Sequence, residues 1–269
     1  MLKTRIITAL VLVAGFIPAL FYLSNTIWAY GTLAVTLLAL NEWASMIKLS
    51  DKSRYVYLAV AAVTGLLAVQ MINQLGFHSF FFQSMHVFLI AALFWLFIVP
   101  FWLAKKWLVN PYVMTALGIL LMASLWLALI CAKGADPWLL LALLATIWIA
   151  DSAAYFAGKN FGKHKLAPNI SPKKTWEGVV GALLAVTLYG AILYFGFNVK
   201  TLAIFPALWI IAGLGVIGDL FESMLKRLAN IKDSGQSLPG HGGILDRIDG
   251  IIPSLPIAIL MIYAYNLWW

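Results

Sequence analysis

Long apolar runs alternate with short polar segments along the whole of this 269-residue chain. A helix needs about 20 apolar residues to cross the ~30 Å hydrocarbon core of a bilayer. The pattern therefore predicts an all-α, polytopic integral membrane protein with about nine transmembrane helices. The runs lie at 1–24, 27–47, 55–72, 85–104, 112–131, 138–157, 178–199, 202–221 and 251–269.

The composition supports this class. Hydrophobic residues make up 63% of the chain and charged residues 10%, whereas soluble domains have about 45–50% apolar and about 25% charged residues. The net charge of +8 does not indicate a nucleic-acid partner, because basic residues in a membrane chain first report topology. The single cysteine, Cys131, lies in an apolar run and fits a packing role.

The distribution of basic residues predicts the orientation. With a cytoplasmic N-terminus, the outer connections carry only Lys133 and Lys200, as the positive-inside rule requires. We expect the first run to remain as an uncleaved span, because it is longer than a usual signal-peptide core, and the protein to lie in the cell inner membrane. The inner segments hold Lys3, Arg5, Lys48, Lys52, Arg54, Lys105, Lys106, Lys159, Lys163, Lys165, Lys173, Lys174, Lys226, Arg227, Lys232 and Arg247.

This topology divides the chain into two parts. Residues 1–131 form N-terminal transmembrane helices with about five spans, and residues 132–269 form a C-terminal region that carries the polar motifs. Two long loops of this region, 158–177 and 222–250, are predicted to share the cytoplasmic side. No internal repeat is visible, so we expect one membrane domain.

Acidic residues are concentrated in the segment from Asp219 to Asp249. The chain has only ten Asp and Glu residues, and ionisable groups bordering a membrane span are candidates for function. The charged residues of this segment are Asp219, Glu222, Lys226, Arg227, Lys232, Asp233, Asp246, Arg247 and Asp249.

Asp219, Asp246 and Asp249 could form a metal site. Asp219 ends one apolar run, and Asp246 and Asp249 share one face of the next helix if that helix begins near residue 244. Such carboxylates could hold magnesium while substrate phosphates complete the coordination shell. Alternatively, Asp219 lies at a solvated helix end, and Asp246 and Asp249 simply cap a helix N-terminus.

The segment SGQSLPGHGG lies between these acids and cannot form a helix, because glycines 235, 240, 242 and 243 and Pro239 interrupt it. Its backbone N–H groups could bind phosphate oxygens, or it could be a flexible linker. His241 could contact phosphate, transfer a proton or merely be solvated.

The other loop contains SPKKTWEG, in which Ser171, Lys173, Lys174 and Thr175 precede a span. This arrangement fits a polyphosphate held at a helix entrance, although lysines also anchor loops at membrane surfaces. Asp151 lies within an apolar span toward the same face. It could belong to the site or pair with a neighbouring helix.

The segment SMLKRLANIKDSGQSLPGHGGILDRIDG resembles the signature of phosphatidate cytidylyltransferases, the CDP-diacylglycerol synthases. DSAAYFAGKNFG and SPKKTWEG are similar to a second conserved block of that family, whereas the first five spans resemble it only in being hydrophobic. The matching signature residues are Ser223, Lys226, Arg227, Lys232, Asp233, Pro239, His241, Gly242, Gly243, Asp246, Arg247 and Asp249.

The resemblance implies that CTP and phosphatidate in the membrane give CDP-diacylglycerol and pyrophosphate with Mg²⁺, and it leaves a second cation open. It also implies a homodimer, metal binding by Asp219 and Asp246 with help from Asp249, and catalytic roles for Asp219, Asp246, Lys226 and Arg247. The substrate-binding set is Asp151, Ser171, Lys173, Lys174, Thr175, Ser223, Arg227, Lys232, Asp233, His241, Gly242 and Gly243.

Two other classes remain open from the sequence. Another CTP-dependent lipid enzyme, such as a polyprenol kinase or an archaeal-type CDP-lipid synthase, would use similar residues. A cation-coupled transporter would also place acids among membrane helices. It would have no use for the Pro-x-His-Gly-Gly segment beside four basic residues.

Overall fold

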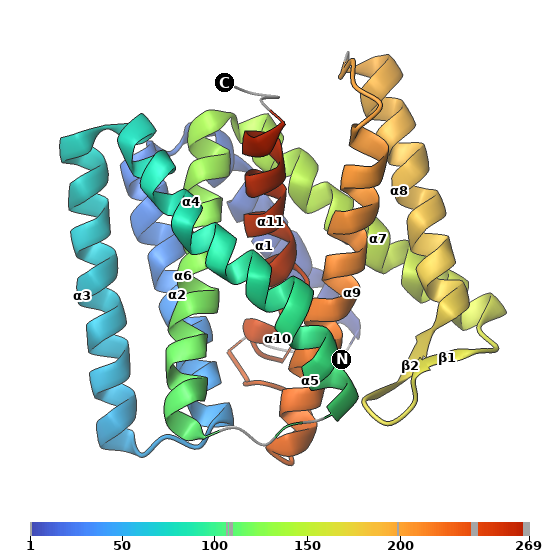
Figure 1. Cartoon of the computed structure of the whole chain (residues 1–269), viewed down its shortest axis with the longest axis horizontal. Helices are drawn as coiled ribbons and strands as arrows, with labels where there is room; N and C mark the ends of the chain where they lie inside the picture. The colour runs from blue at the N-terminus through green and yellow to red at the C-terminus, as the bar shows by residue number, and fades with distance from the viewer. Residues whose placement is uncertain (1, 106, 108–109, 198, 238–241, 266–269) are drawn as a thin grey trace.

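The computed structural model describes residues 2–105, 107, 110–197, 199–237 and 242–265. Most of these residues are helical, and the helices stand side by side as a bundle (Figure 1). The elements in order are α1 (Leu2–Tyr22), α2 (Asn25–Met46), α3 (Asp51–Leu75), α4 (Phe77–Leu93), η1 (Phe94–Ile98), α5 (Val99–Lys105), α6 (Pro111–Ala135), α7 (Pro137–Phe161), β1 (Lys165–Ala167), β2 (Ser171–Thr175), α8 (Trp176–Gly196), α9 (Ile204–Leu228), α10 (Leu245–Ile248) and α11 (Ile251–Ala264).

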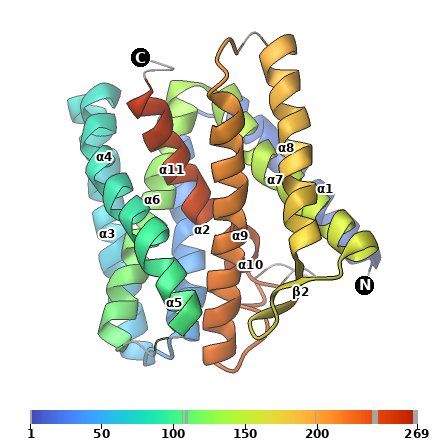
Figure 2. The ribbon, with the colours of Figure 1, turned by 45° about the vertical axis from the view of Figure 1, so that its right-hand side comes forward.

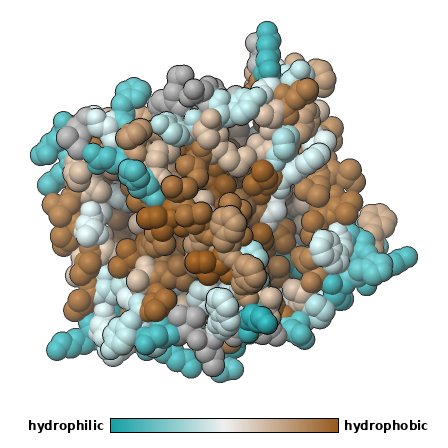
Figure 3. Space-filling view, viewed as in Figure 1, coloured by the Kyte–Doolittle hydropathy of each residue, from teal (hydrophilic) through white to brown (hydrophobic). Residues whose placement is uncertain are grey.

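Each apolar run predicted from the sequence is mostly helical in the described residues, with some run ends in turns or coil. Within them, seven helical segments are long and apolar enough to cross a membrane; α2 and the described apolar part of α1 are not among these seven. The space-filling view shows an apolar middle with polar side chains toward both ends (Figure 3). The chain is thus an all-α, multi-pass membrane protein in its general architecture.

Helix α11 is at the centre of the bundle. It packs against α4, α6, α7 and α9, and every residue from Ile252 to Ile259 is buried. A helix that is apolar on all sides can lie in the core of a protein or within a membrane, and α11 lies among other helices. Because α10 immediately precedes α11, this central packing also positions the acidic residues around Asp246.

The predicted loop 158–177 is only partly a loop. Helix α7 continues to Phe161, and β1 and β2 then form an antiparallel hairpin in which Lys165 pairs with Thr175 and Ala167 with Ser171. Thr175 ends the hairpin and caps α8, because its hydroxyl accepts a hydrogen bond from the Gly178 N–H at 3.2 Å. The all-α prediction therefore needs one correction, a two-stranded sheet.

The prediction of a loop over residues 222–250 is also wrong in its first part. Helix α9 extends to Leu228, so Glu222, Ser223 and Lys226 are helical. Polar residues do not end this helix because they pair one turn apart: the Ser223 hydroxyl donates to Asp219, and Lys226 donates to Glu222.

The long polar segments lie at the same end of the bundle. The hairpin and the C-terminal end of α9 are at the bottom of Figure 1, whereas the α6–α7 and α8–α9 connections are at the top, and Figure 2 shows the same arrangement. Lys133 is in the last turn of α6, and Lys200 lies between α8 and α9. The two basic residues assigned to the outer side are therefore far from the polar hairpin.

Candidate active site

Two distant segments of the chain meet through an ion pair. The Lys174 ammonium of β2 lies 2.7 Å from the Asp219 carboxylate of α9. The Ser223 hydroxyl, one helical turn further along, donates to the other Asp219 oxygen at 3.1 Å. The structure thus brings together Lys174, Asp219 and Ser223, three of the residues predicted from separate motifs.

Asp151 and Asp249 lie near this ion pair. The charges of Asp151 on α7 and Asp249 after α10 each interact with those of Asp219 and Lys174. One Asp249 oxygen accepts a hydrogen bond from the Gly250 N–H at 2.8 Å. Two further carboxylates therefore lie near the Lys174–Asp219 ion pair at the polar end of the bundle.

The approach of Asp249 to α9 depends on Gly218. A Cβ atom at Gly218 would overlap the Asp249 carbonyl oxygen and come within 2.8 Å of the Pro253 side chain. Glycine allows two helices to pack this closely. Gly218 thus sets the separation between Asp219 and Asp249, although it binds nothing itself.

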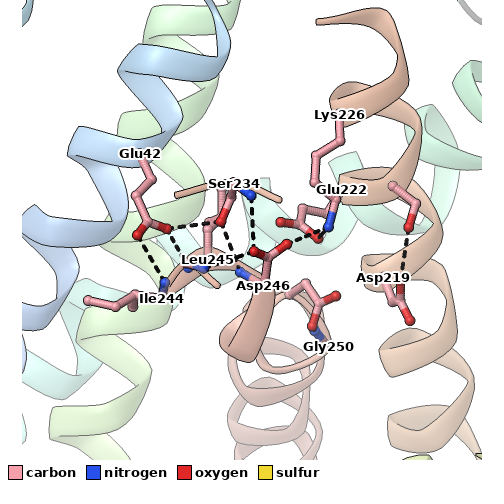
Figure 4. Close-up of polar contacts among 12 residues, drawn as sticks. Glu42, Asp219, Glu222, Lys226, Ser234, Ile244, Leu245, Asp246 and Gly250 are labelled. Carbon is pink, nitrogen blue, oxygen red and sulfur yellow. Dashed lines mark hydrogen bonds and ion pairs between the residues drawn. The ribbon is translucent and has the colours of Figure 1, made fainter. Parts of the chain in front are cut away.

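Lys226 forms a second, more buried group of charges. Its ammonium lies 2.6 Å from Glu222 and 2.5 Å from Asp246 (Figure 4), and the three side chains are only 12%, 5% and 8% exposed. By contrast, the Asp219 side chain is 38% exposed. In this structure, Lys226 therefore forms ion pairs with two internal acids, and Asp219 is the more accessible carboxylate.

Asp246 is held by three donors. One oxygen accepts from Lys226, and the other accepts from the N–H groups of Ser234 and Gly243, both at 3.0 Å. We predicted that backbone N–H groups of the glycine segment bind phosphate. In this structure, however, the Gly243 N–H donates to Asp246. Gly242 has φ +84°, a backbone conformation that glycine adopts without a steric penalty.

The other predicted site residues differ in exposure. Lys173, Arg227, Lys232, Asp233 and Arg247 are exposed, and Ser171 is partly buried in β2. Asp246 and Arg247 are in α10, as expected for a helix that begins near residue 244. His241 and Pro239 lie outside the described residues.

Sequence reasoning missed Glu42 of α2. Its side chain is buried and accepts hydrogen bonds from the segment 234–245. The available signal was an acid within an otherwise apolar run. No local spacing could name its partners, because they lie 192 to 203 residues away.

An aromatic cluster packs against α9 next to Glu222. Trp95, Phe94 and Trp102 pack edge-on against Phe221, the neighbour of Glu222, with ring centroids 5.3 to 5.8 Å apart. Phe94 and Trp95 lie in η1, a π-helical turn that ends just before Pro100, which has no N–H to donate.

The oxygen donors fit a hard divalent cation in their chemistry. Carboxylates are the ligands that Mg²⁺ uses in proteins, and a cation beside Asp219 would reduce the repulsion among Asp151, Asp219 and Asp249. Within the described residues, however, no group of three or more His, Cys, Asp or Glu side chains is already arranged as a ligand set. Asp246 is occupied by Lys226 and two N–H groups.

Comparison with known proteins defines the class. The model of the cytidylyltransferase family matches residues 3–265, so the chain belongs to that family. A phosphatidate cytidylyltransferase of Haemophilus influenzae is 33% identical over 282 residues, which cover 95% of this chain and 96% of the relative. One of Pseudomonas aeruginosa is 36% identical over 284 residues, or 98% of each. One of Thermotoga maritima is 42% identical over 129 residues, or 45% of this chain.

Proposed function

We propose that this protein transfers the cytidylyl group of CTP to phosphatidate, giving CDP-diacylglycerol and pyrophosphate. The observation that carries the proposal is the Lys174–Asp219 ion pair, which joins both predicted motifs at the polar end of a membrane bundle. Phosphatidate is anchored in a leaflet and CTP is soluble, so a polar site at the membrane boundary is where they can meet.

The chemistry needs positioning more than a strong base. A phosphate oxygen of phosphatidate forms a bond to the α-phosphorus of CTP, and the bond from that phosphorus to the oxygen of the leaving pyrophosphate breaks. Phosphate is already ionised near neutral pH, so the protein has to align the reactants and neutralise charge. Lys174 pairs with Asp219, and the exposed Lys173, Arg227, Lys232 and Arg247 add positive charge to the same polar segments.

We propose that Mg²⁺ is held by Asp219 and Asp249. When bound, it would polarise the α-phosphate and stabilise the leaving pyrophosphate. Asp246, also predicted as a ligand, can join only if its ion pair with Lys226 opens. The charge of Asp151 acts on Asp219 and Asp249, so Asp151 increases the negative potential that attracts a cation.

We propose nine spans, a cytoplasmic N-terminus and an inner-membrane location. The proposal is supported by the gathering of the basic segments at one end of the bundle, because cytoplasmic segments carry the excess of Lys and Arg. We also propose a homodimer, on the family resemblance alone. Light scattering of the detergent-solubilised protein tests this, and a monomer mass in active protein would reject the dimer.

Product analysis tests the reaction. Purified protein in detergent is incubated with CTP, phosphatidate and Mg²⁺, and the nucleotide and phosphate products are separated. Cytidylyl transfer releases pyrophosphate and a CDP-lipid in equal amounts. Release of CDP with a phosphorylated lipid would instead identify a kinase and reject the proposal.

A further inference from the structure

The carboxylate of Glu42 is a buried acceptor in the half of the chain that carries no motif. Its residue is 4% exposed. Four donors surround the carboxylate: the hydroxyls of Ser234 and Ser237 at 3.0 and 2.5 Å, and the N–H groups of Ile244 and Leu245 at 3.0 and 2.9 Å. A buried carboxylate is stable only with such partners.

These donors lie at both ends of one segment. Ser234 and Ser237 follow α9, whereas Ile244 caps α10 and Leu245 begins it. Figure 4 shows Ser234, Ile244 and Leu245 near Glu42. Glu42 therefore joins Ser234 and Ser237 to Ile244 and Leu245 at α2. The predicted phosphate-binding glycines, Gly242 and Gly243, lie in the same segment.

Two glycines provide the space for this carboxylate. A Cβ atom at Gly235 would lie 2.5 Å from a Glu42 oxygen, and one at Gly243 would overlap the other oxygen and the Ser234 hydroxyl. Both glycines are thus explained by the close approach of Glu42. Gly235 and Gly243 therefore reflect the shape of the contact with α2.

The same contacts continue to the buried charges. Ser234 donates its hydroxyl to Glu42 and its N–H to Asp246, and its hydroxyl accepts from the Asp246 N–H at 3.3 Å. Asp246 in turn binds Lys226. A displacement of the segment at Glu42 would therefore move Asp246 relative to α9.

We propose that Glu42 is a positioning residue for the cytidylyl transfer, acting on Asp246 through Ser234. This inference rests on the proposed function. It predicts that loss of the Glu42 carboxylate lowers turnover by more than the accompanying loss of fold stability explains. An alternative is that Glu42 only joins α2 to the rest of the bundle.

The test compares Glu42→Gln with Trp43→Phe. Glutamine keeps the length of the side chain, but its amide nitrogen cannot accept the donors that face one of the carboxylate oxygens. Trp43 is also buried in α2, and its indole N–H donates to the Met114 carbonyl at 2.9 Å, away from the segment. Trp43→Phe therefore weakens the packing of α2 without removing the carboxylate.

In the full-length enzyme, Glu42→Gln is expected to lower kcat by about 10- to 100-fold, as loss of a residue that orients functional groups does. Hydrogen–deuterium exchange of residues 234–237 and 242–245 should accelerate. Trp43→Phe should keep kcat within about threefold at a similar thermal midpoint. Equal losses of kcat in both variants, or wild-type kcat in Glu42→Gln, would overturn the proposal.

Two further measurements separate the possible failures. If Glu42→Gln does not fold, Ser237→Ala provides a second test, because it removes a single hydrogen bond to Glu42. It should give smaller changes in the same direction; unchanged exchange and kcat would overturn the proposal.

If the wild-type protein makes no CDP-lipid, the proposed function fails. Slow exchange of the segment in wild type and fast exchange in Glu42→Gln would then still show that Glu42 anchors it.

Discussion

At the residue scale, the Lys226 ammonium forms ion pairs with two buried carboxylates. Lys226→Met would leave Glu222 and Asp246 without their cation, and breaking such a buried pair costs about 3–5 kcal/mol. We therefore expect a clear drop in the free energy of unfolding, measured by chemical denaturation in detergent. Adding Glu222→Gln should recover part of the loss, because it removes one uncompensated charge. No recovery in the double variant would contradict this account of the ion pairs.

Asp219 should behave in the opposite way. Its side chain is 38% exposed and paired with Lys174, and exposed pairs contribute about 0–1 kcal/mol. Asp219→Asn should therefore fold normally but lose turnover by roughly 100-fold or more, since a metal-binding group supplies several kcal/mol in the transition state.

Steady-state kinetics and thermal unfolding of the same preparations check this prediction. Asp136→Asn is the matched control, because Asp136 caps α7 at the far end of the bundle and accepts from the Trp138 N–H. It should retain both properties. An Asp219→Asn variant with near wild-type turnover would remove Asp219 from the site.

At the element scale, Gly218 fixes the distance between α9 and the start of α11. A methyl group there would overlap the Asp249 carbonyl oxygen, and forcing extra atoms into close packing costs about 1–3 kcal/mol. Gly218→Ala should therefore destabilise the protein and reduce turnover by moving Asp249 away from Asp219.

Gly213→Ala is the control for this prediction. It makes the same change in the same helix, but a Cβ atom at Gly213 would meet nothing within 4 Å. Alanine should be neutral or stabilising there, because glycine in a helix interior costs about 1 kcal/mol. Equal thermal midpoints for the two variants would show that the contact between α9 and the α10–α11 turn is not tight.

The elements themselves were largely predictable because a membrane span leaves a long apolar run. Their polar ends were not. Helix α9 extends through Lys226 because its charged residues pair along the helix. Residues 165–175 form a hairpin, but its two strands are too short and polar to show an alternating pattern in the sequence.

At the scale of the whole molecule, the orientation can be tested by cysteine labelling. Cys131 is buried and can be replaced by alanine. In intact cells, a membrane-impermeant maleimide should label Lys200→Cys directly, but should label Lys165→Cys only after the membrane is opened. Both lysines are exposed. The reverse pattern would place the hairpin outside and contradict the proposed topology.

Contacts between residues far apart in the sequence were the hardest feature to predict. The motif residues around Asp219 and Asp246 could be predicted, but not that Asp246 pairs with Lys226 while Asp219 pairs with Lys174. The partners of Glu42 could not be predicted for the same physical reason, because its donors come from the other end of the chain. The packing of α10 against α2 and of β2 against α9 reveals these partners.

The most direct test of the site is a structure of the protein with Mg²⁺ and a CTP analogue whose α–β bridge is a methylene group, which blocks transfer. The account predicts that the triphosphate lies between β2 and α9, with Lys174 on a phosphate oxygen and Asp219 on the cation. A nucleotide bound elsewhere, with the Lys174–Asp219 ion pair still intact, would contradict it.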